Sequence, residues 1–112
     1  MSIEKVKSYF KQFNMEDKIM EFPVSSATVT EAAKALNCQE AHIAKTMSFK
    51  LNEDAILVVM AGDMRIDNHK FKEKFHKKAT MLKADEVEPM TGFPIGGVCP
   101  FAPKDGVKVY LD

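Results

Sequence analysis

One lysine stands where the sequence pattern calls for an apolar side chain. Between Ile43 and Leu51 apolar and polar residues alternate, as in a strand with one buried face, and Lys45 is in phase with the apolar set. Burying an ammonium group is costly unless it meets a partner or a cleft, so lysines at such positions often bind anions or serve catalysis. Alternatively, the strand begins at Thr46 and Lys45 reaches solvent from the preceding turn. The pattern leaves both interpretations open.

The second candidate site is the loop from Thr91 to Pro103, which holds three of the five glycines and three of the five prolines. Prolines stiffen the loop, while the pair Gly96-Gly97 allows backbone conformations closed to other residues. Its backbone N–H groups are suited to hold a carboxylate, a carbonyl or a developing oxyanion. It is not a P-loop, because no Gly-Lys-Ser/Thr follows the glycines. A plain helix-to-strand connection is the alternative.

The remaining chemical groups give weaker signals. Cys99 could act as a nucleophile, but no histidine or aspartate is placed by sequence to activate it. The two cysteines lack a CxxC companion, and the three histidines show no zinc-type spacing, so we expect neither a metal nor another cofactor. Four lysines share one side of a helix after Asp67: Lys70, Lys74, Lys77 and Lys78. Such a face is more often a solvated surface than a contact for nucleic-acid phosphates.

Composition narrows the class of protein. Sixteen basic residues balance sixteen acidic ones, so net charge gives no argument for strong nucleic-acid binding, and we expect no DNA partner. There is no apolar run of about 20 residues, the length that a membrane span requires, and no apolar leader at the N-terminus. We therefore expect a cytoplasmic protein without membrane contact. A chain of 112 residues suits one domain.

The elements that must position these groups are a mixture of helices and short strands. Thr28 and Glu31 form the capping-box signature of a helix, Asp67 can cap another, and the apolar run from Ala55 to Ala61 indicates a strand buried on both faces. The pattern predicts a mixed α/β domain of the α+β type, with helices around a largely antiparallel sheet. Further helices are expected around Ile3–Phe13 (Ser2 capping it) and Ala84–Met90, and further strands at Ile19–Phe22, Ala79–Leu82 and Val107–Leu111.

Three segments, in order, resemble the YbaK family of aminoacyl-tRNA deacylases, which includes the editing domain of bacterial prolyl-tRNA synthetases. The first is Thr30–Leu36 followed by Ala41-His42-Ile43-Ala44-Lys45-Thr46, and the second is Ala55–Asp63, the buried strand that ends in Gly62-Asp63. The third and most specific is Thr91-Gly92-Phe93-Pro94-Ile95-Gly96-Gly97-Val98-Cys99-Pro100-Phe101. Their order and spacing match over nearly the whole chain.

The resemblance implies a barrel-like sheet wrapped by helices, and metal-independent hydrolysis in trans of the ester between a wrong amino acid and its tRNA. Lys45 falls on the family's essential lysine, which would hold the substrate carbonyl or adjacent backbone rather than attack it. Gly96, Gly97 and Val98 would place amides around the aminoacyl group, with Gly92 and Pro100 completing the binding loop. A ribose hydroxyl would assist the attack. Small amino acids such as Ala or Cys, on tRNA-Pro, are the expected substrates.

One departure concerns the C-terminal end. Family members typically continue beyond Val109-Tyr110-Leu111-Asp112 with another strand and helix, so we expect the chain to lack these elements. The partners expected are aminoacyl-tRNA, prolyl-tRNA synthetase and, through an exposed sheet edge, a second copy of the chain.

Three functions follow in order of preference. A trans-acting deacylase comes first; a non-catalytic module that binds aminoacyl-tRNA, an amino acid or a synthetase comes second; an enzyme that depends on Cys99 comes third. Loss of turnover in Lys45→Ala, binding without turnover, and inactivation by thiol alkylation distinguish them.

Overall fold

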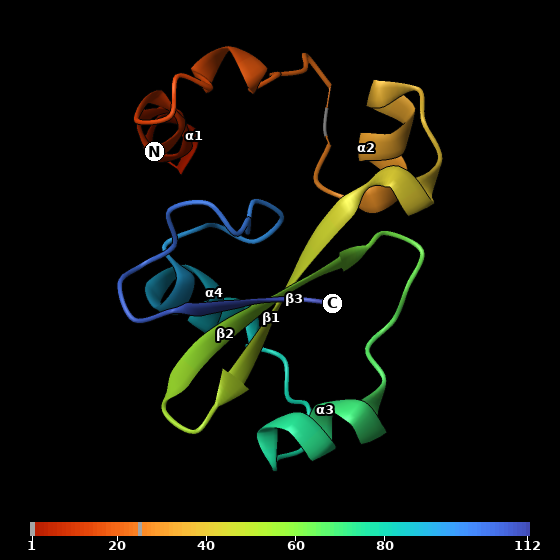
Figure 1. The fold of residues 1–112 in the computed structure, drawn as a ribbon, viewed down its shortest axis with the longest axis vertical. Coiled ribbons are helices and arrows are strands. Elements are labelled where there is room, and N and C mark those ends of the chain that lie inside the picture. Colours follow the sequence, from red (N-terminus) through yellow and green to blue (C-terminus); the bar gives the residue numbers. More distant parts are fainter. Residues whose placement is uncertain (1, 25) are drawn as a thin grey trace.

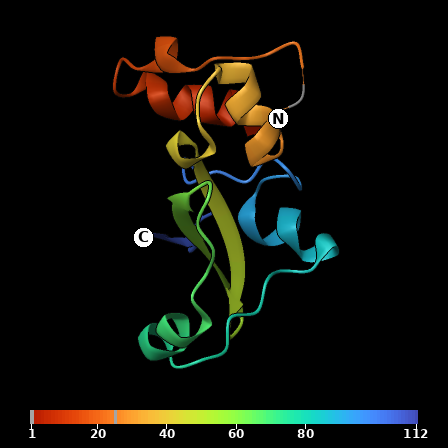
Figure 2. The ribbon, with the colours of Figure 1, turned by 90° about the vertical axis from the view of Figure 1, so that its right-hand side faces the viewer.

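The computed structural model describes residues 2–24 and 26–112. Helices α1 and α2 lie at one end of the molecule and α3 at the other, while α4 runs alongside the sheet (Figures 1 and 2). Two 3-10 turns, η1 and η2, separate some of these elements. Their bounds are α1 Ser2–Lys11, η1 Glu16–Lys18, α2 Val29–Leu36, η2 Glu40–His42, β1 Ala44–Leu51, β2 Asp54–Ala61, α3 Asn68–Phe75, α4 Ala84–Thr91 and β3 Lys108–Leu111.

The three strands pair in the order β1-β2-β3. Strands β1 and β2 form an antiparallel hairpin with Ala44 opposite Ala61, and β3 pairs with β2 in parallel, with Val59 opposite Leu111. The mixed α/β class is confirmed. Within the described residues, however, the sheet stays open rather than closing into a barrel, and only one of its two strand pairs is antiparallel.

The hairpin gives the sheet two buried faces. On one face Phe49, Ile56, Val58 and Met60 form a core cluster with Phe71 of α3. On the other face a second cluster joins β2 to α4 through Ala55, Leu82 and Val87. Because β2 contributes to both clusters, its uninterrupted apolar run is explained by burial on both sides.

Local capping chemistry sets the starts of two helices as the sequence predicts. The hydroxyl of Thr28 accepts a hydrogen bond from the backbone N–H of Glu31 at 3.1 Å, and Asp67 accepts bonds from the N–H groups of His69 and Lys70. These contacts satisfy donors that have no partner inside a helix. The cap expected at Ser2 falls on a side chain outside the described part of the structure.

Two predicted strands are corrected. Ile19–Phe22 is part of the connection between η1 and α2 and forms no strand. It runs at the end of the molecule away from the sheet (Figure 1), so none of the strands in the described residues lies beside it. The segment Ala79–Leu82 is reduced to a single bridge between Met81 and Phe49. The segment lies beside the C-terminal half of β1, where the N–H of Lys50 donates to the carbonyl of Thr80 at 2.8 Å.

Strand β3 lies at an edge of the sheet, and the side chain of Leu111 is 81% exposed. The predicted pairing of this edge with a second copy of the chain stays a prediction. None of the helices in the described ranges combines the length and the apolar character that crossing a membrane demands.

Candidate functional site

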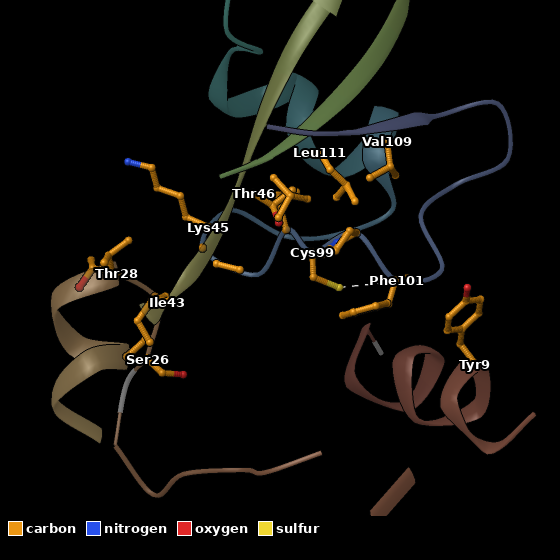
Figure 3. Close-up of a pocket in the computed structure, with 18 residues that line it drawn as sticks. Tyr9, Ser26, Thr28, Ile43, Lys45, Thr46, Cys99, Phe101, Val109 and Leu111 are labelled. Carbon is orange, nitrogen blue, oxygen red and sulfur yellow. Dashed lines mark hydrogen bonds between the residues drawn. The ribbon is translucent and has the colours of Figure 1, made fainter. Parts of the chain in front are cut away.

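A cavity of about 870 Å³ lies against the face of the sheet that carries Thr46 and Val59, between the start of α2 and the glycine loop (Figure 3). Lys45, Gly96, Val98 and Pro100, four of the residues singled out from sequence, line it together. The other lining residues come from α1, from α2 and the segment before it, from the strands and from the rest of the loop: Tyr9, Ser26, Ala27, Thr28, Val29, Ala32, Ile43, Ala44, Thr46, Val59, Cys99, Phe101, Val109 and Leu111.

The start of β1 decides between the two interpretations of Lys45. The strand begins at Ala44, so Lys45 belongs to it and pairs with Met60. Its half-buried side chain shares a sheet face with Met47 and Phe49 because all three alternate with Thr46 and Ser48. The strand therefore does start early enough to place Lys45 on the apolar side.

The ammonium group of Lys45 is held by the turn that follows β2. It donates a hydrogen bond to the carbonyl oxygen of Gly62 at 3.2 Å, and another to the carbonyl oxygen of Met64. Figure 3 shows the side chain pointing away from Cys99 and Leu111, so its stem borders the cavity while its charge lies outside. These two carbonyl acceptors replace hydration that the ammonium group loses beside the protein.

Gly62, which the sequence places at the end of the buried strand, has a packing role that the pattern does not predict. A β-carbon at this position would lie 2.6 Å from Cγ1 of Val29 and closer still to the carbonyl oxygen of Glu40. Its own N–H donates to the carbonyl of Ile43 at 2.7 Å. The end of β2 therefore touches the backbone leading into β1, and glycine is the residue that allows this approach.

The glycine loop is anchored at its start by buried hydrogen bonds. The side chains of Thr91 and Phe93 are fully buried, and the Thr91 hydroxyl donates to the carbonyl of Val87 at 2.7 Å while accepting from the N–H of Phe93 at 3.1 Å. Lys5 of α1 lies over the Phe93 ring, with its ammonium nitrogen 5.4 Å from the ring centre. This anchoring gives the following loop a fixed starting point.

The predicted glycines have different roles in the loop. Gly92 ends α4 with a φ of 87°, and Gly96 has a φ of 81°; both values lie in the left-handed region that favours glycine. The N–H of Gly97 is engaged in a turn with the carbonyl of Pro94 at 2.9 Å. Within the described part of the chain, the N–H groups of Gly96 and Val98 have no protein partner. Gly96 and Val98 therefore present free amides beside the cavity, whereas Gly92 and Gly97 shape the loop.

Cys99 lies on the cavity wall with its thiol directed to a backbone carbonyl. The thiol sulfur is 3.6 Å from the carbonyl oxygen of Phe101, and burial raises the pKa of the thiol above its ordinary value. A raised pKa keeps the group in its neutral form, which is the weak nucleophile. Among the described residues lining the cavity there is no histidine, aspartate or glutamate.

Across the described residues, no three histidine, cysteine or acidic side chains gather as a metal site would require. Of the four lysines on and after α3, Lys70 and Lys74 line a smaller cavity of about 460 Å³ together with Tyr110 of β3. That cavity lies on the α3 side of the sheet, so this basic group is separated from the candidate site by the sheet itself.

Tyr9 lines the cavity although the sequence pattern did not predict this role. The sequence predicts it only as part of a helix around Ile3–Phe13, yet it contributes to the cavity wall. Its pairing with Phe101, at 6.3 Å between ring centres, joins α1 to the glycine loop. This contact joins residues far apart in sequence, so no local pattern signals it.

Comparison with known proteins assigns the chain to a family. Residues 24–112 match the model of the aminoacyl-tRNA editing domain. Protein YwhH of Bacillus subtilis (strain 168), which is uncharacterised, is 46% identical over 113 residues, covering 100% of this chain and 72% of its own. The proline–tRNA ligase of Leptospira interrogans (serogroup Icterohaemorrhagiae, serovar copenhageni) is 30% identical over 92 residues, which cover 76% of this chain and 15% of the ligase.

A solved structure agrees with this assignment. The crystal structure of a candidate trans-editing enzyme for prolyl-tRNA synthetase superposes with a TM-score of 0.85 at 29% identity, covering 99% of this chain and 71% of that one. The region that matches the family model, residues 24–112, contains Lys45, the glycine loop and every strand of the described sheet. The chain belongs to the aminoacyl-tRNA editing domain family.

Proposed function

We propose that this protein is a trans-acting hydrolase that removes a wrongly attached small amino acid, such as Ala or Cys, from tRNA-Pro. In this reaction the oxygen of water bonds to the aminoacyl carbonyl carbon and the ester C–O bond breaks. The ribose hydroxyl leaves with a proton, and the amino acid is released as the free acid. The observation that carries the proposal is the cavity shared by Lys45, Gly96, Val98 and Pro100 in a chain of the editing family.

The backbone amides of Gly96 and Val98 are the groups we assign to the developing oxyanion. Both lie in the loop that borders the cavity, and neither N–H has a partner among the described residues. Amide donors fixed in advance stabilise the charge that grows on the carbonyl oxygen as water attacks. Loss of one such donor typically lowers kcat about 10²- to 10³-fold.

Lys45 is assigned to hold the substrate through its carbonyl or the adjacent backbone. Its ammonium donates hydrogen bonds to the backbone carbonyls of Gly62 and Met64. The carbonyl of the substrate is an acceptor of the same kind. On substrate binding, rotation of the flexible four-carbon stem exchanges one of them for the aminoacyl group. Lysine suits this exchange because its ammonium is a compact charge with three donors.

The side chains around the cavity fit a reaction in which the substrate assists itself. Thr46, Ser26 and Tyr9 supply hydroxyl groups, and a hydroxyl of the terminal ribose would position the attacking water. We propose that this reaction needs no metal, so a chelator such as EDTA leaves turnover unchanged. Apolar walls select small side chains, and one methylene is worth about 1–3 kcal/mol in such a selection.

The test is deacylation of tRNAs charged with Ala, Cys, Ser or Pro, with wild-type protein, Lys45→Ala and the control Lys108→Ala. Lys108 is an exposed lysine of β3, so its removal changes charge equally without touching the cavity. We expect turnover of one small amino acid by wild type and Lys108→Ala, and its loss in Lys45→Ala. Absence of turnover on every substrate would sink the enzymatic proposal.

A non-catalytic binding module is the second candidate, favoured by the direction of Lys45. Its ammonium points away from the cavity (Figure 3), as it would if it served only the turn after β2. This function predicts that charged tRNA binds wild type and Lys45→Ala equally, without turnover in either. Under both functions we propose cytoplasmic aminoacyl-tRNA as the ligand and prolyl-tRNA synthetase as a partner, which size-exclusion chromatography of the mixed proteins tests.

A further inference from the structure

An aromatic cluster stands at the edge of the cavity where α1 meets the glycine loop. The ring of Phe101 lies edge-on to Phe10, with centres 4.6 Å apart and planes at 73°, and next to Tyr9 at 6.3 Å and 36°. Phe101 is nonetheless 42% exposed. Phe10 therefore holds Phe101 in place while part of the Phe101 ring stays open to a ligand.

Helix α1 reaches this site from outside the family match. The match begins at residue 24, whereas α1 ends at Lys11. Tyr9 of this helix lines the same cavity as Lys45 and Gly96. The region matched by the family model thus builds most of the cavity, and α1 adds an aromatic side chain to its wall.

The size of the cavity exceeds what a small amino acid fills. Its volume of about 870 Å³ lies in the upper part of the range of about 300–1,000 Å³ that encloses drug-sized ligands. An alanyl or cysteinyl group occupies only a fraction of that space. The group next to it in the proposed substrate is the terminal adenosine of tRNA, whose ribose carries the ester. The remaining volume is therefore suited to a nucleoside.

We propose that Tyr9 and Phe101 form a stacking platform for the adenine base of that terminal adenosine. This inference rests on the proposed function and names the part of the substrate that the aromatic wall binds. Flat aromatic side chains favour this role because bases stack on them through their π-faces, with little dependence on sequence. The platform would fix the ester next to the amides of Gly96 and Val98.

Tyrosine fluorescence tests the platform by direct binding. The chain has two tyrosines and no tryptophan, so Tyr110→Phe leaves Tyr9 as the sole tyrosine emitter, and Tyr9→Phe leaves Tyr110. Tyr110 lies on the α3 side of the sheet, where its ring packs edge-on against Phe75 at 4.9 Å, and phenylalanine retains that packing. The probe is 3′-alanylamino-3′-deoxyadenosine, in which a stable amide replaces the ester.

We expect the probe to quench the emission of Tyr9. After correction for the light that the probe itself absorbs, the emission of Tyr110 should be unchanged. The same alanylamino sugar without the base should quench neither. Equal changes at both tyrosines, or none at either, would overturn the platform. This measurement does not depend on turnover, so it decides the proposal even if the protein hydrolyses nothing.

Kinetics separate the platform from a structural role of the cluster. Tyr9→Leu and Phe101→Leu should each raise KM for the charged tRNA about 10-fold with kcat unchanged, as expected for lost base stacking. Phe13→Leu is the matched control, because Phe13 contacts Tyr9 at 5.5 Å, is 57% exposed and lies outside the cavity wall. Wild-type turnover with an unchanged KM in both platform variants would refute the platform and leave the hydrolase proposal standing.

Discussion

The ammonium of Lys45 donates a hydrogen bond to the carbonyl oxygen of Gly62, 3.2 Å away. Lys45 is the second residue of β1, and Gly62 follows the last residue of β2, so the bond joins the open end of the hairpin to the turn that leads to α3. The stem of the same lysine borders the cavity. One side chain thus contributes to both the fold and the candidate site, and its variants must be measured for both.

Substitution of Lys45 by methionine and by arginine separates these two contributions. Lys45→Met keeps an unbranched stem but loses the donors to both carbonyls, and we expect a loss of about 1 kcal/mol in the free energy of unfolding. Lys45→Arg retains charge and donors and should stay close to wild type in stability. Its planar, larger guanidinium does not substitute for a compact ammonium, so we expect it to lack turnover.

Urea denaturation and the deacylation assay measure the two effects on the same preparations. If Lys45→Arg turned over substrate at the wild-type rate, a positive charge would suffice and the specific assignment of the lysine would fail. If Lys45→Met were as stable as wild type, the bonds to the turn would contribute nothing to the fold.

Gly62→Ala should destabilise the protein by about 1–3 kcal/mol, the range for overpacking a tight contact. The new β-carbon would meet the carbonyl oxygen of Glu40, which is backbone and cannot rotate away as a side chain would. Ala61→Ser is the matched control, since residue 61 is exposed and gains an atom of similar size. The urea midpoints of the two variants check this; a Gly62→Ala midpoint equal to that of the control would contradict the close approach.

The ion pair between Lys50 of β1 and Glu86 of α4, at 2.8 Å, should make stability depend on pH. The hydrogen bond from Lys50 holds the pKa of Glu86 below its ordinary 4.5, and the same bond raises the pKa of Lys50 above 10.5. The contribution of the Glu86 carboxylate is therefore complete above pH 4.5 and is lost as the pH falls through its lower folded-state pKa. That of Lys50 is complete below pH 10.5 and is lost as the pH rises through its higher folded-state pKa.

Glu86→Gln is expected to reduce this dependence, because the amide carries no charge but still accepts the bond that the carboxylate takes from the N–H of Lys83. Glu88→Gln, an exposed acid on the same helix, serves as the control. Urea midpoints measured across the acidic range should converge for wild type and Glu86→Gln as the pH falls. Parallel curves for the two proteins would show that the pair does not couple stability to pH.

Interactions between residues close in the sequence were predicted well. The capping box of Thr28 and Glu31 and the cap at Asp67 depend on a few neighbouring residues, so their side-chain types identify them. The buried strand β2 was visible because a run of apolar residues is required when both faces are covered. Alternation along β1 left two interpretations of Lys45 open, and the start of the strand at Ala44 decides between them.

Interactions between distant residues were not predictable in this way. The carbonyls that hold Lys45 come from residues 17 and 19 positions later, and no local pattern reports them. Ile19–Phe22 has a strand-like composition but no edge within reach, and the parallel pairing of β3 depends on the route of the loop before it. Tyr9 was likewise predicted only as part of the first helix, because its contact with Phe101 joins residues far apart in the sequence.

The two cysteines should differ in reactivity, and this difference tests the third function. Burial raises the pKa of Cys99, whereas Cys38 is exposed just after α2, so iodoacetamide at neutral pH should modify Cys38 first. Mass spectrometry of timed samples measures the order. Cys99→Ala, which removes the thiol without blocking the cavity, should retain turnover of the charged tRNA. Faster alkylation of Cys99, together with loss of turnover in Cys99→Ala, would instead identify the thiol as a nucleophile. The catalytic roles assigned to Lys45 and the loop amides would then be wrong.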